Sequence, residues 1–483
     1  MSVKFKLGCI KVSELSKMVG GEMHLFGGAC EADECLGIDI DSRKIESGDI
    51  FVAIKGERVD GIDYIESAIN SGAVCVLASY LPKCVKDING RFCVITCSDP
   101  TVAVGDIARE YKKRISLKTI GVTGSVGKTT TKELIYAVLS EKFKVHKTEG
   151  NHNNELGLPL SILGIDADCE AAVLEMGMSD FREIARLSEI AEPDFGVVTT
   201  IGTSHMETLG SRENICKAKM EIVEGMKESG ELVLCGDEPL LYAYRFSEYN
   251  PTYISVYNNE AEFRAVNVRY SDNMTSFDLL RNREVVTNLQ VPALGLHHVY
   301  SALFAYAIGV KFGLDADTIR RGFMNFKNAA MRQSVYEIGG VTIIDACYNA
   351  SPESMKASLE VLCEMSKQRG GARKMALLGD MRELGSETRS LHENLGSFVA
   401  SKKLDKLFTY GVAASSIASS AVNDGMKETD VFDNPDITDP LASGRAMLDV
   451  IKAGDIILFK ASRAMAVEKI LNFLKENEDK IGG

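Results

Sequence analysis

The sequence predicts an α/β protein that is divided into three domains. A chain of 483 residues is too long to fold around a single hydrophobic core. Between about 115 and 328, apolar strand-like runs alternate with helical segments, which favours a mostly parallel sheet with helices on both faces. The same alternation begins again after about 329. We therefore expect domains at residues 1–113, 114–328 and 329–483.

The first domain contains short strands and helices and one informative stretch. Asp41-Ser42-Arg43 ends an alternating strand, where the Ser42 hydroxyl and the Arg43 guanidinium could face a pyrophosphate. A solvated turn is the alternative, and it is the more frequent explanation for Ser-Arg at the end of a strand. A helical segment over 101–114 then leads into the second domain.

A phosphate loop is predicted at the start of the second domain. In residues 119–131, TIGVTGSVGKTTT, an apolar strand ends in glycines and a helical segment follows. The glycines let backbone N–H groups converge on phosphate oxygens, Lys128 supplies a cation, and Thr129 offers a hydroxyl to Mg²⁺. The residue six before Lys128 is Val122 instead of glycine, and a plain glycine turn with a surface lysine is the alternative. The nucleotide-binding residues predicted here are Gly124, Ser125, Val126, Gly127, Lys128, Thr129 and Thr130.

Two further strands of this domain deliver candidate metal ligands at their carboxyl ends. Glu175 ends the strand over 171–175, and His205 follows the strand that begins at Phe195. Ligands of open α/β sheets collect at this edge, so both side chains would share a crevice with the phosphate loop. A carboxylate and an imidazole there suit a Mg²⁺ ion that bridges ATP and substrate. The alternative makes Glu175 a solvated acid and His205 a helix cap.

Three other residues of the second domain, Lys219, His297 and His298, lie on helical segments with a marked apolar character. Lys219 lies on the apolar side of a helix that begins near 211, where a lysine normally extends its charge to water. His297 and His298 stand at the start of a strongly apolar helix. Consecutive histidines cannot easily chelate one metal, so we interpret them as capping or base-contacting groups.

The third domain is predicted to be a compact, doubly wound, Rossmann-like sheet. Strands are expected at 341–345, 374–379, 406–410 and 455–460, each followed by a helical pattern. Polar residues cluster where these strands end, which indicates a binding edge. They are Asp345, Tyr348, Asn349, Asp380, Lys460, Ser462 and Arg463.

Composition excludes several classes of protein. The formal net charge of −13 argues against a general nucleic-acid or membrane-surface binder, which would carry a basic stripe. The chain has neither a signal-peptide pattern at its start nor a run of about 18 apolar residues, so we expect a cytoplasmic protein without a membrane partner. The 12 cysteines form no Cys-x-x-Cys pair and several lie in apolar runs, which favours reduced core thiols.

Several stretches, spread over essentially the full chain, resemble the Mur ligases. They are GVTGSVGKTT at 121–130, NHNNELGLPL at 151–160, EMGM at 175–178, IGTSH at 201–205, DACYNA at 345–350 and LGDMREL at 378–384. The set looks most like the member that adds D-alanyl-D-alanine to UDP-N-acetylmuramoyl-tripeptide. The resemblance implies an N-terminal domain for the UDP-sugar, a central ATPase domain and a C-terminal Rossmann-like domain that receives the amine. It also implies ATP-dependent ligation through an acyl phosphate.

The resemblance further implies roles for individual residues. Thr129, Glu175 and His205 would hold two Mg²⁺ ions together with Lys219, which would be carbamylated. Arg332 would meet the ATP phosphates, Asp345 the ribose, and His297 the adenine, while Ser42 and Arg43 would lie near the UDP group. The remaining substrate contacts would come from Asn153, Asn154, Tyr348, Asn349, Lys460 and Arg463.

The sequence departs from the family pattern near the expected adenine site. His297-His-Val-Tyr-Ser301 stands where His-Asn-x-x-Asn is common. Two alternatives stay open: a sister ligase, such as the tripeptide-forming enzyme or folylpolyglutamate synthase, and a nucleotide-binding protein without ligase activity. We also expect a monomer that closes its domains around its substrates.

Overall fold

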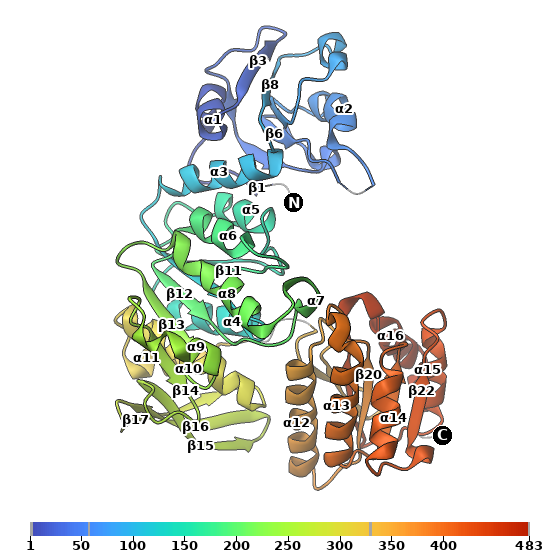
Figure 1. Cartoon of the computed structure of the whole chain (residues 1–483). Coiled ribbons are helices and arrows are strands. Elements are labelled where there is room, and N and C mark those ends of the chain that lie inside the picture. The colour runs from blue at the N-terminus through green and yellow to red at the C-terminus, as the bar shows by residue number, and fades with distance from the viewer. Residues whose placement is uncertain (1–2, 57, 328–330, 482–483) are drawn as a thin grey trace.

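The computed structural model describes residues 3–56, 58–327 and 331–481, which form three large sheets with helices around them (Figure 1) and one small sheet of β2 (Ile10–Lys11) and β4 (Glu34–Cys35). The three large sheets lie within residues 3–96, 118–291 and 334–460. The α/β class and the three-part architecture predicted from the sequence are confirmed. The expected boundary between 328 and 329 lies outside the described residues.

The N-terminal sheet has six strands in the order β1-β5-β6-β7-β8-β3. Its centre is parallel, whereas β1 and β3 run antiparallel to their neighbours at the two edges. Helices α1 (Val12–Val19) and α2 (Ile65–Asn70) accompany it. The strands are β1 (Val3–Lys4), β3 (Glu22–Phe26), β5 (Gly37–Asp39), β6 (Asp49–Val52), β7 (Cys75–Ala78) and β8 (Phe92–Thr96).

The central sheet has nine strands in the order β10-β11-β9-β12-β13-β14-β15-β16-β17. All pairs from β10 to β15 are parallel, as predicted, but β15, β16 and β17 form antiparallel hairpins. The hairpin turns, Asp272-Asn273 and Asn282-Arg283, have positive φ angles at both residues, which matches the right-handed twist of the flanking strands. The strands are β9 (Lys118–Thr123), β10 (Val145–Lys147), β11 (Ala171–Glu175), β12 (Phe195–Val198), β13 (Glu231–Cys235), β14 (Thr252–Ser255), β15 (Phe263–Ser271), β16 (Met274–Arg281) and β17 (Glu284–Val291).

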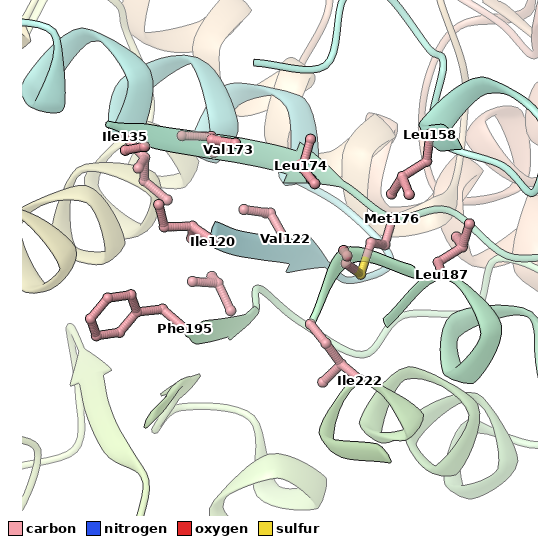
Figure 2. Packing of buried hydrophobic residues seen from close by; sticks show 14 of the residues in the cluster. Ile120, Val122, Ile135, Leu158, Val173, Leu174, Met176, Leu187, Phe195 and Ile222 are labelled. Carbon is pink, nitrogen blue, oxygen red and sulfur yellow. The ribbon is translucent and has the colours of Figure 1, made fainter. Parts of the chain in front are cut away.

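The core of the central domain is built around β9. Figure 2 shows Ile120 and Val122 of this strand among buried side chains from the neighbouring strands and from helices. Gly121 lies between them, and a Cβ there would be 3.0 Å from the Met176 methyl group and 3.2 Å from Ile222. The glycine that offsets the phosphate-loop pattern therefore belongs to the packing of the strand. The helices include α4 (Lys128–Leu139), α5 (Gly157–Leu163), α6 (Glu183–Ala191), α8 (Arg212–Met220), α10 (Leu296–Lys311) and α11 (Ala316–Met324).

Helix α3 (Pro100–Lys112) joins the N-terminal domain to the central domain (Figure 1). Its N-cap is Asp99, whose side chain accepts hydrogen bonds from the N–H groups of Thr101 and Val102. Arg186 of α6 donates to Asp106 at 2.7 Å and to the Val102 carbonyl at 3.1 Å. One hydrophobic cluster runs through both domains, from Val3 to Phe326.

The C-terminal sheet has the order β18-β19-β23-β20-β21-β22. Its four predicted strands are present, and two more, the antiparallel β18 and the parallel edge strand β22, extend it. Separate hydrophobic clusters cover its two faces. The elements include β18 (Ser334–Ile338), β19 (Val341–Asp345), β20 (Lys374–Gly379), β21 (Lys406–Tyr410), β22 (Val431–Asn434), β23 (Ile456–Lys460), α12 (Pro352–Gln368), α13 (Thr388–Ser401), α14 (Ser415–Asn423), α15 (Pro440–Leu448) and α16 (Glu468–Glu476).

The cysteines are free thiols, and eight of the 12 are buried, which confirms the expectation of reduced core residues for those eight. Cys30 and Cys84 are instead exposed. In the part of the chain that the structure describes, every helix is too short or too polar to span a lipid bilayer.

Candidate active site

The phosphate loop connects β9 to α4 and is held in place by the two residues that follow β12. Gly124 has φ +143°, and a Cβ there would overlap the Thr199 hydroxyl, so only glycine fits. The N–H of Ser125 donates to the Thr200 carbonyl at 2.9 Å, and the Thr199 hydroxyl donates to the Val126 carbonyl at 2.6 Å. These bonds fix the loop, and its last N–H groups lie at the N-terminus of α4. Free N–H groups at a helix N-terminus bind anions.

Glu175 is buried at the carboxyl end of β11, with a relative exposure of 1%. One of its oxygens accepts from the Thr129 hydroxyl at 2.8 Å, and the other accepts from the Asn153 amide at 2.9 Å. Its own N–H donates to the Thr148 hydroxyl at 3.0 Å. A carboxylate and a hydroxyl are thus fixed side by side next to the phosphate loop.

This part of the site contains several buried lysines, and Lys132 Nζ lies 3.8 Å from Glu175 Oε2. Lys128 Nζ donates to the Gly124 carbonyl at 2.8 Å, which folds the side chain over the loop. Burial lowers the pKa of Lys128, with Glu175 opposing the shift and Arg332 adding to it. Burial, and then the charge of Lys128, lower the pKa of Lys219 well below its usual value. The buried Lys219 on α8 therefore has a larger neutral fraction than an exposed lysine.

His205 directly precedes α7 (Met206–Leu209) and has a left-handed backbone with φ +65°. Its Nδ1 lies 2.6 Å from Glu383 Oε2, and the Glu207 N–H donates to the Glu383 carbonyl at 3.2 Å. The hydrogen bond from His205 lowers the pKa of Glu383. Figure 1 shows α7 beside the C-terminal domain, so this pair bridges the two domains.

A cavity of about 440 Å³ lies between the central and C-terminal domains. It brings together most of the residues predicted from the sequence: Ser125, Val126, Gly127, Lys128, Thr130, Asn153, Asn154, Glu175, His205, His297, Arg332, Tyr348, Asn349 and Lys460. Other predicted residues are not part of its lining: Gly124, Thr129, Lys219, Asp345, Arg463, Ser42 and Arg43.

Cations from the C-terminal domain face this cavity. The Arg332 guanidinium lies 4.0 Å from the centre of the Tyr348 ring. Lys460 Nζ donates to the Asn349 carbonyl at 3.0 Å, and burial, with a contribution from Arg332, lowers the pKa of Lys460 to about 8. Together with Lys128 they give the cavity a positive lining suited to phosphates and carboxylates.

Several predicted residues have structural partners of their own. Asp345 accepts from the Cys347 N–H at 3.2 Å and from the Tyr336 hydroxyl at 3.5 Å. Arg463 pairs with Glu468 at 3.4 Å. The Asn154 side chain lines the cavity, but its Oδ1 also accepts from the Gly157 N–H at 2.8 Å and so caps α5.

Ser42 and Arg43 lie in a 3₁₀ turn of the N-terminal domain. Ser42 is buried, whereas the Arg43 side chain is exposed and bound to both oxygens of Asp41, at 2.8 and 2.9 Å. The hydrogen bond from Arg43 lowers the pKa of Asp41 to about 2. A pyrophosphate at this turn would therefore compete with Asp41 for the guanidinium.

The two histidines of the first turn of α10 pack against each other, with ring centres 4.2 Å apart. The N-cap of this helix is Gly295, so neither imidazole caps it. Burial and the charge of Lys460 lower the pKa of His297 to about 4, and a hydrogen bond with Gln333 opposes this shift. Neither ring nitrogen of the buried His298 has a hydrogen-bond partner among the described residues.

A second cavity, of about 290 Å³, adjoins the phosphate loop and shares Val126, Gly127 and His297 with the first. Its lining includes the apolar side chains of Leu296 and Phe304. It also includes four acidic residues: Asp237, Glu238, Glu353 and Glu360. Lysine and arginine are absent from the described lining, so the two cavities differ in charge.

Sequence reasoning missed Thr148, Thr199 and Glu383 as parts of this site. Thr148 directly follows β10 and Thr199 directly follows β12, so the rule that ligands gather at strand ends could have identified both. Glu383 follows β20 in a loop, and its pairing with His205 depends on how two domains dock. Local sequence patterns contain no signal for such a contact.

Three family models match the chain: "Mur ligase family, catalytic domain" at 35–109, "Mur ligase middle domain" at 122–309 and "Mur ligase, glutamate ligase domain" at 331–463. The UDP-N-acetylmuramoyl-tripeptide–D-alanyl-D-alanine ligase of Bacillus subtilis (strain 168) is 38% identical over 96% of this chain and 98% of that protein. The Escherichia coli (strain K12) ligase of the same name is 28% identical over 97% of this chain and 99% of its own length.

Solved structures resemble the whole chain as well. The structure of MurF from Acinetobacter baumannii has a TM-score of 0.87 and 26% identity, covering 98% of this chain and all of that one. The MurF ligase from Thermotoga maritima in complex with ADP has a TM-score of 0.80 and 30% identity, covering 92% of this chain and 98% of that one.

Proposed function

The chain belongs to the Mur ligase family, and from this we propose that it joins D-alanyl-D-alanine to UDP-N-acetylmuramoyl-tripeptide at the expense of ATP. The product is the UDP-N-acetylmuramoyl-pentapeptide precursor of peptidoglycan. The observation that carries this proposal is the cavity between the domains, where a phosphate loop, a buried carboxylate and two cations of the C-terminal domain meet. Relatives named for this reaction match nearly the full length of the chain.

The reaction has two steps that the cavity suits. The terminal carboxylate of the tripeptide attacks the γ-phosphate of ATP, which forms an acyl phosphate and releases ADP. The amine of D-alanyl-D-alanine then attacks the acyl carbon, and the tetrahedral intermediate expels phosphate as the amine loses its proton. Transfer between two anions depends on positioning and on charge neutralisation. Lys128, Arg332 and Lys460 provide positive charge on both sides of the cavity.

The donor atoms fit Mg²⁺, which favours oxygen and is commonly held by one or two carboxylates together with substrate phosphates. Thr129 and Glu175 would hold one ion, and His205 would help to hold a second. No group of three or more His, Cys, Asp or Glu side chains able to hold a metal is found among the described residues. When bound, Mg²⁺ neutralises phosphate charge.

Lys219 is proposed to be carbamylated. Its low pKa leaves the amine free to attack CO₂, and loss of a proton then gives a carbamate anion. A buried amine beside Lys128 becomes a buried anion in this way, which would be able to bind Mg²⁺. The repulsion between the two lysines is thereby converted into an attraction.

The remaining contacts follow the resemblance. Arg332 would meet the phosphates of ATP, Asp345 the ribose and His297 the adenine. The substrates would be held by Ser42, Arg43, Asn153, Asn154, Tyr348, Asn349, Lys460 and Arg463. We further propose a cytoplasmic monomer without nucleic-acid or membrane partners, since both substrates are small and water-soluble, and domain limits at 113/114 and 328/329.

Phosphate release tests the proposed function directly. The assay contains ATP, Mg²⁺ and UDP-N-acetylmuramoyl-tripeptide, with and without D-alanyl-D-alanine, and mass spectrometry follows the product. Release that depends on the dipeptide, together with the mass of the pentapeptide, is the expected result. Release with a single amino acid and a shorter acceptor would instead identify a sister ligase, and nucleotide binding without release under either condition would identify a non-catalytic binder.

A further inference from the structure

Glu353 of the C-terminal domain reaches into the central domain. It is the second residue of α12, whose start is fixed by Pro352 and by a capping box between Ser351 and Ser354. Its Oε1 accepts from the Thr203 hydroxyl at 3.1 Å. Figure 1 shows α12 on the side of the C-terminal domain that faces the central domain.

The carboxylate of Glu353 lies directly over Gly202. A Cβ at position 202 would be 2.9 Å from the Glu353 carboxyl carbon, so a larger residue would displace the acid. The Thr203 hydroxyl and the bare backbone of Gly202 thus fix the carboxylate of Glu353. Glu353 is also one of the residues that line the second cavity.

The other oxygen of Glu353, Oε2, is buried and has no hydrogen-bond partner among the described residues. A buried carboxylate oxygen without a partner is costly, and in native proteins such atoms are rare. Because Glu353 also lines the second cavity, a ligand there that offers a hydrogen-bond donor would give this carboxylate a further partner.

The difference in charge between the two cavities indicates which ligand this is. The triphosphate of ATP suits the first cavity, which carries Lys128, Arg332 and Lys460. The second cavity shares Val126 and Gly127 of the phosphate loop but has acids and apolar groups, so it would repel phosphates. Its volume, about 290 Å³, is near the lower end of the range of roughly 300–1,000 Å³ for ligand sites. An uncharged nucleoside fits these conditions.

We propose that Glu353 accepts a hydrogen bond from the nucleoside part of ATP, either from a ribose hydroxyl or from the 6-amino group of adenine. The proposal rests on the proposed function, because ATP at the phosphate loop determines where the nucleoside lies. Asp345, which the resemblance assigns to the ribose, lines neither cavity. Glu353 would also make nucleotide binding depend on the C-terminal domain, since it belongs to α12 of that domain and lines the second cavity.

The test compares nucleotide affinity in two variants, Glu353→Gln and Glu353→Asp, by calorimetric titration of the full chain with Mg²⁺ and without acceptor substrate. The ligands are ATP, 2′-deoxy-ATP, 3′-deoxy-ATP and inosine triphosphate, which lacks the 6-amino group. Thermal unfolding checks that each variant is folded, and the second variant keeps the test available if the first is not. Glu360→Gln is the matched control, because it removes one negative charge from the same cavity.

Glu353→Gln keeps an acceptor oxygen but loses the negative charge, so it is expected to weaken ATP binding by about fivefold, because an amide oxygen accepts a weaker hydrogen bond than a carboxylate does. A loss that disappears with one deoxy nucleotide identifies the ribose hydroxyl, and a loss that disappears with inosine triphosphate identifies the amino group. Unchanged affinity, an equal loss for all four nucleotides, or the same loss in Glu360→Gln would overturn the inference. Wild-type protein that bound no ATP would instead refute the proposed function.

Discussion

Nδ1 of His205 lies 2.6 Å from Oε2 of Glu383, so an imidazole of the central domain is held by a carboxylate of the C-terminal domain. Both residues have left-handed backbones, with φ +65° at each. An acceptor at Nδ1 leaves Nε2 available toward the cavity. The orientation of His205 is therefore linked to the docking of the two domains.

Glu383→Ala is expected to loosen this docking. The Glu383 side chain is 58% exposed, and such pairs are worth about 0–1 kcal/mol, so the docked population should fall by at most about fivefold. Small-angle scattering of the free protein should show a larger radius of gyration in the variant, and an ATP analogue with the UDP-substrate should restore compaction. Glu383→Gln, which keeps an acceptor oxygen, is the control. Identical profiles for all three proteins would contradict a role in docking.

Lys219→Ala is expected to abolish ligation, because the proposed carbamate is lost. Formate or acetate should restore part of the rate by supplying a carboxylate in the space that remains. Phosphate release measures both effects, and Lys217→Ala, an exposed lysine of the same helix, should retain activity. An unchanged rate in Lys219→Ala would remove the carbamate from the mechanism.

Gly124→Ala is expected to abolish nucleotide binding. The added methyl group would overlap the Thr199 hydroxyl, and the φ angle of +143° is unfavourable for alanine. Gly425→Ala is the matched control, since Gly425 has φ +104° but nothing within 4 Å of the position that a Cβ would take, so it tests backbone strain alone. We expect a cost of about 1–3 kcal/mol in the control with nucleotide binding intact. Equal nucleotide affinity in the two variants would show that the loop tolerates the overlap.

The protein is expected to lose stability as the pH falls from about 6.5 toward 4. Burial lowers the pKa of His146 to about 4, and its Nε2 forms a hydrogen bond of 2.9 Å with the Ser161 hydroxyl. Below about 6.5 the unfolded chain binds a proton at this histidine and the folded chain does not, so protonation favours unfolding. At pH 5, the contribution of His146 should lower the free energy of unfolding by about 1–2 kcal/mol.

Urea unfolding at pH 7 and pH 5 measures this effect. His146→Gln keeps a polar partner for Ser161 but does not titrate, so its loss of stability between the two pH values should be smaller by that amount. NMR of the histidine ring protons should also show His146 to be neutral at pH 5. An equal loss of stability between pH 7 and pH 5 in both proteins would mean that His146 does not contribute to the pH dependence.

The parts of the fold and site that depend on local sequence could be predicted. The phosphate loop was identifiable because its glycines, Lys128 and Thr129 are adjacent in sequence, and Glu175 because it ends a buried strand. The antiparallel strands β16 and β17 were not predicted, although the Asp272-Asn273 and Asn282-Arg283 turns were a usable signal.

The remaining features depend on distant contacts. Arg43 is bound by Asp41, and Asp345 by Tyr336 and Cys347, because side chains satisfy their charges with whatever the fold brings near. The interaction of Glu383 with His205 and that of Glu353 with Thr203 exist only once two domains dock. No periodicity or spacing in the sequence contains that information.

Because of helix α3, the first two domains are held to each other more firmly than to the C-terminal domain. Its polar contacts with α6 hold the first two domains together, and so does the hydrophobic cluster from Val3 to Phe326. The C-terminal sheet has its own cores, to which the central domain adds only Leu294 and Tyr270 among the described residues. Under a pulling force applied to the two ends of the chain, the C-terminal domain should therefore detach first as one block, while the other two bear the load as a single unit.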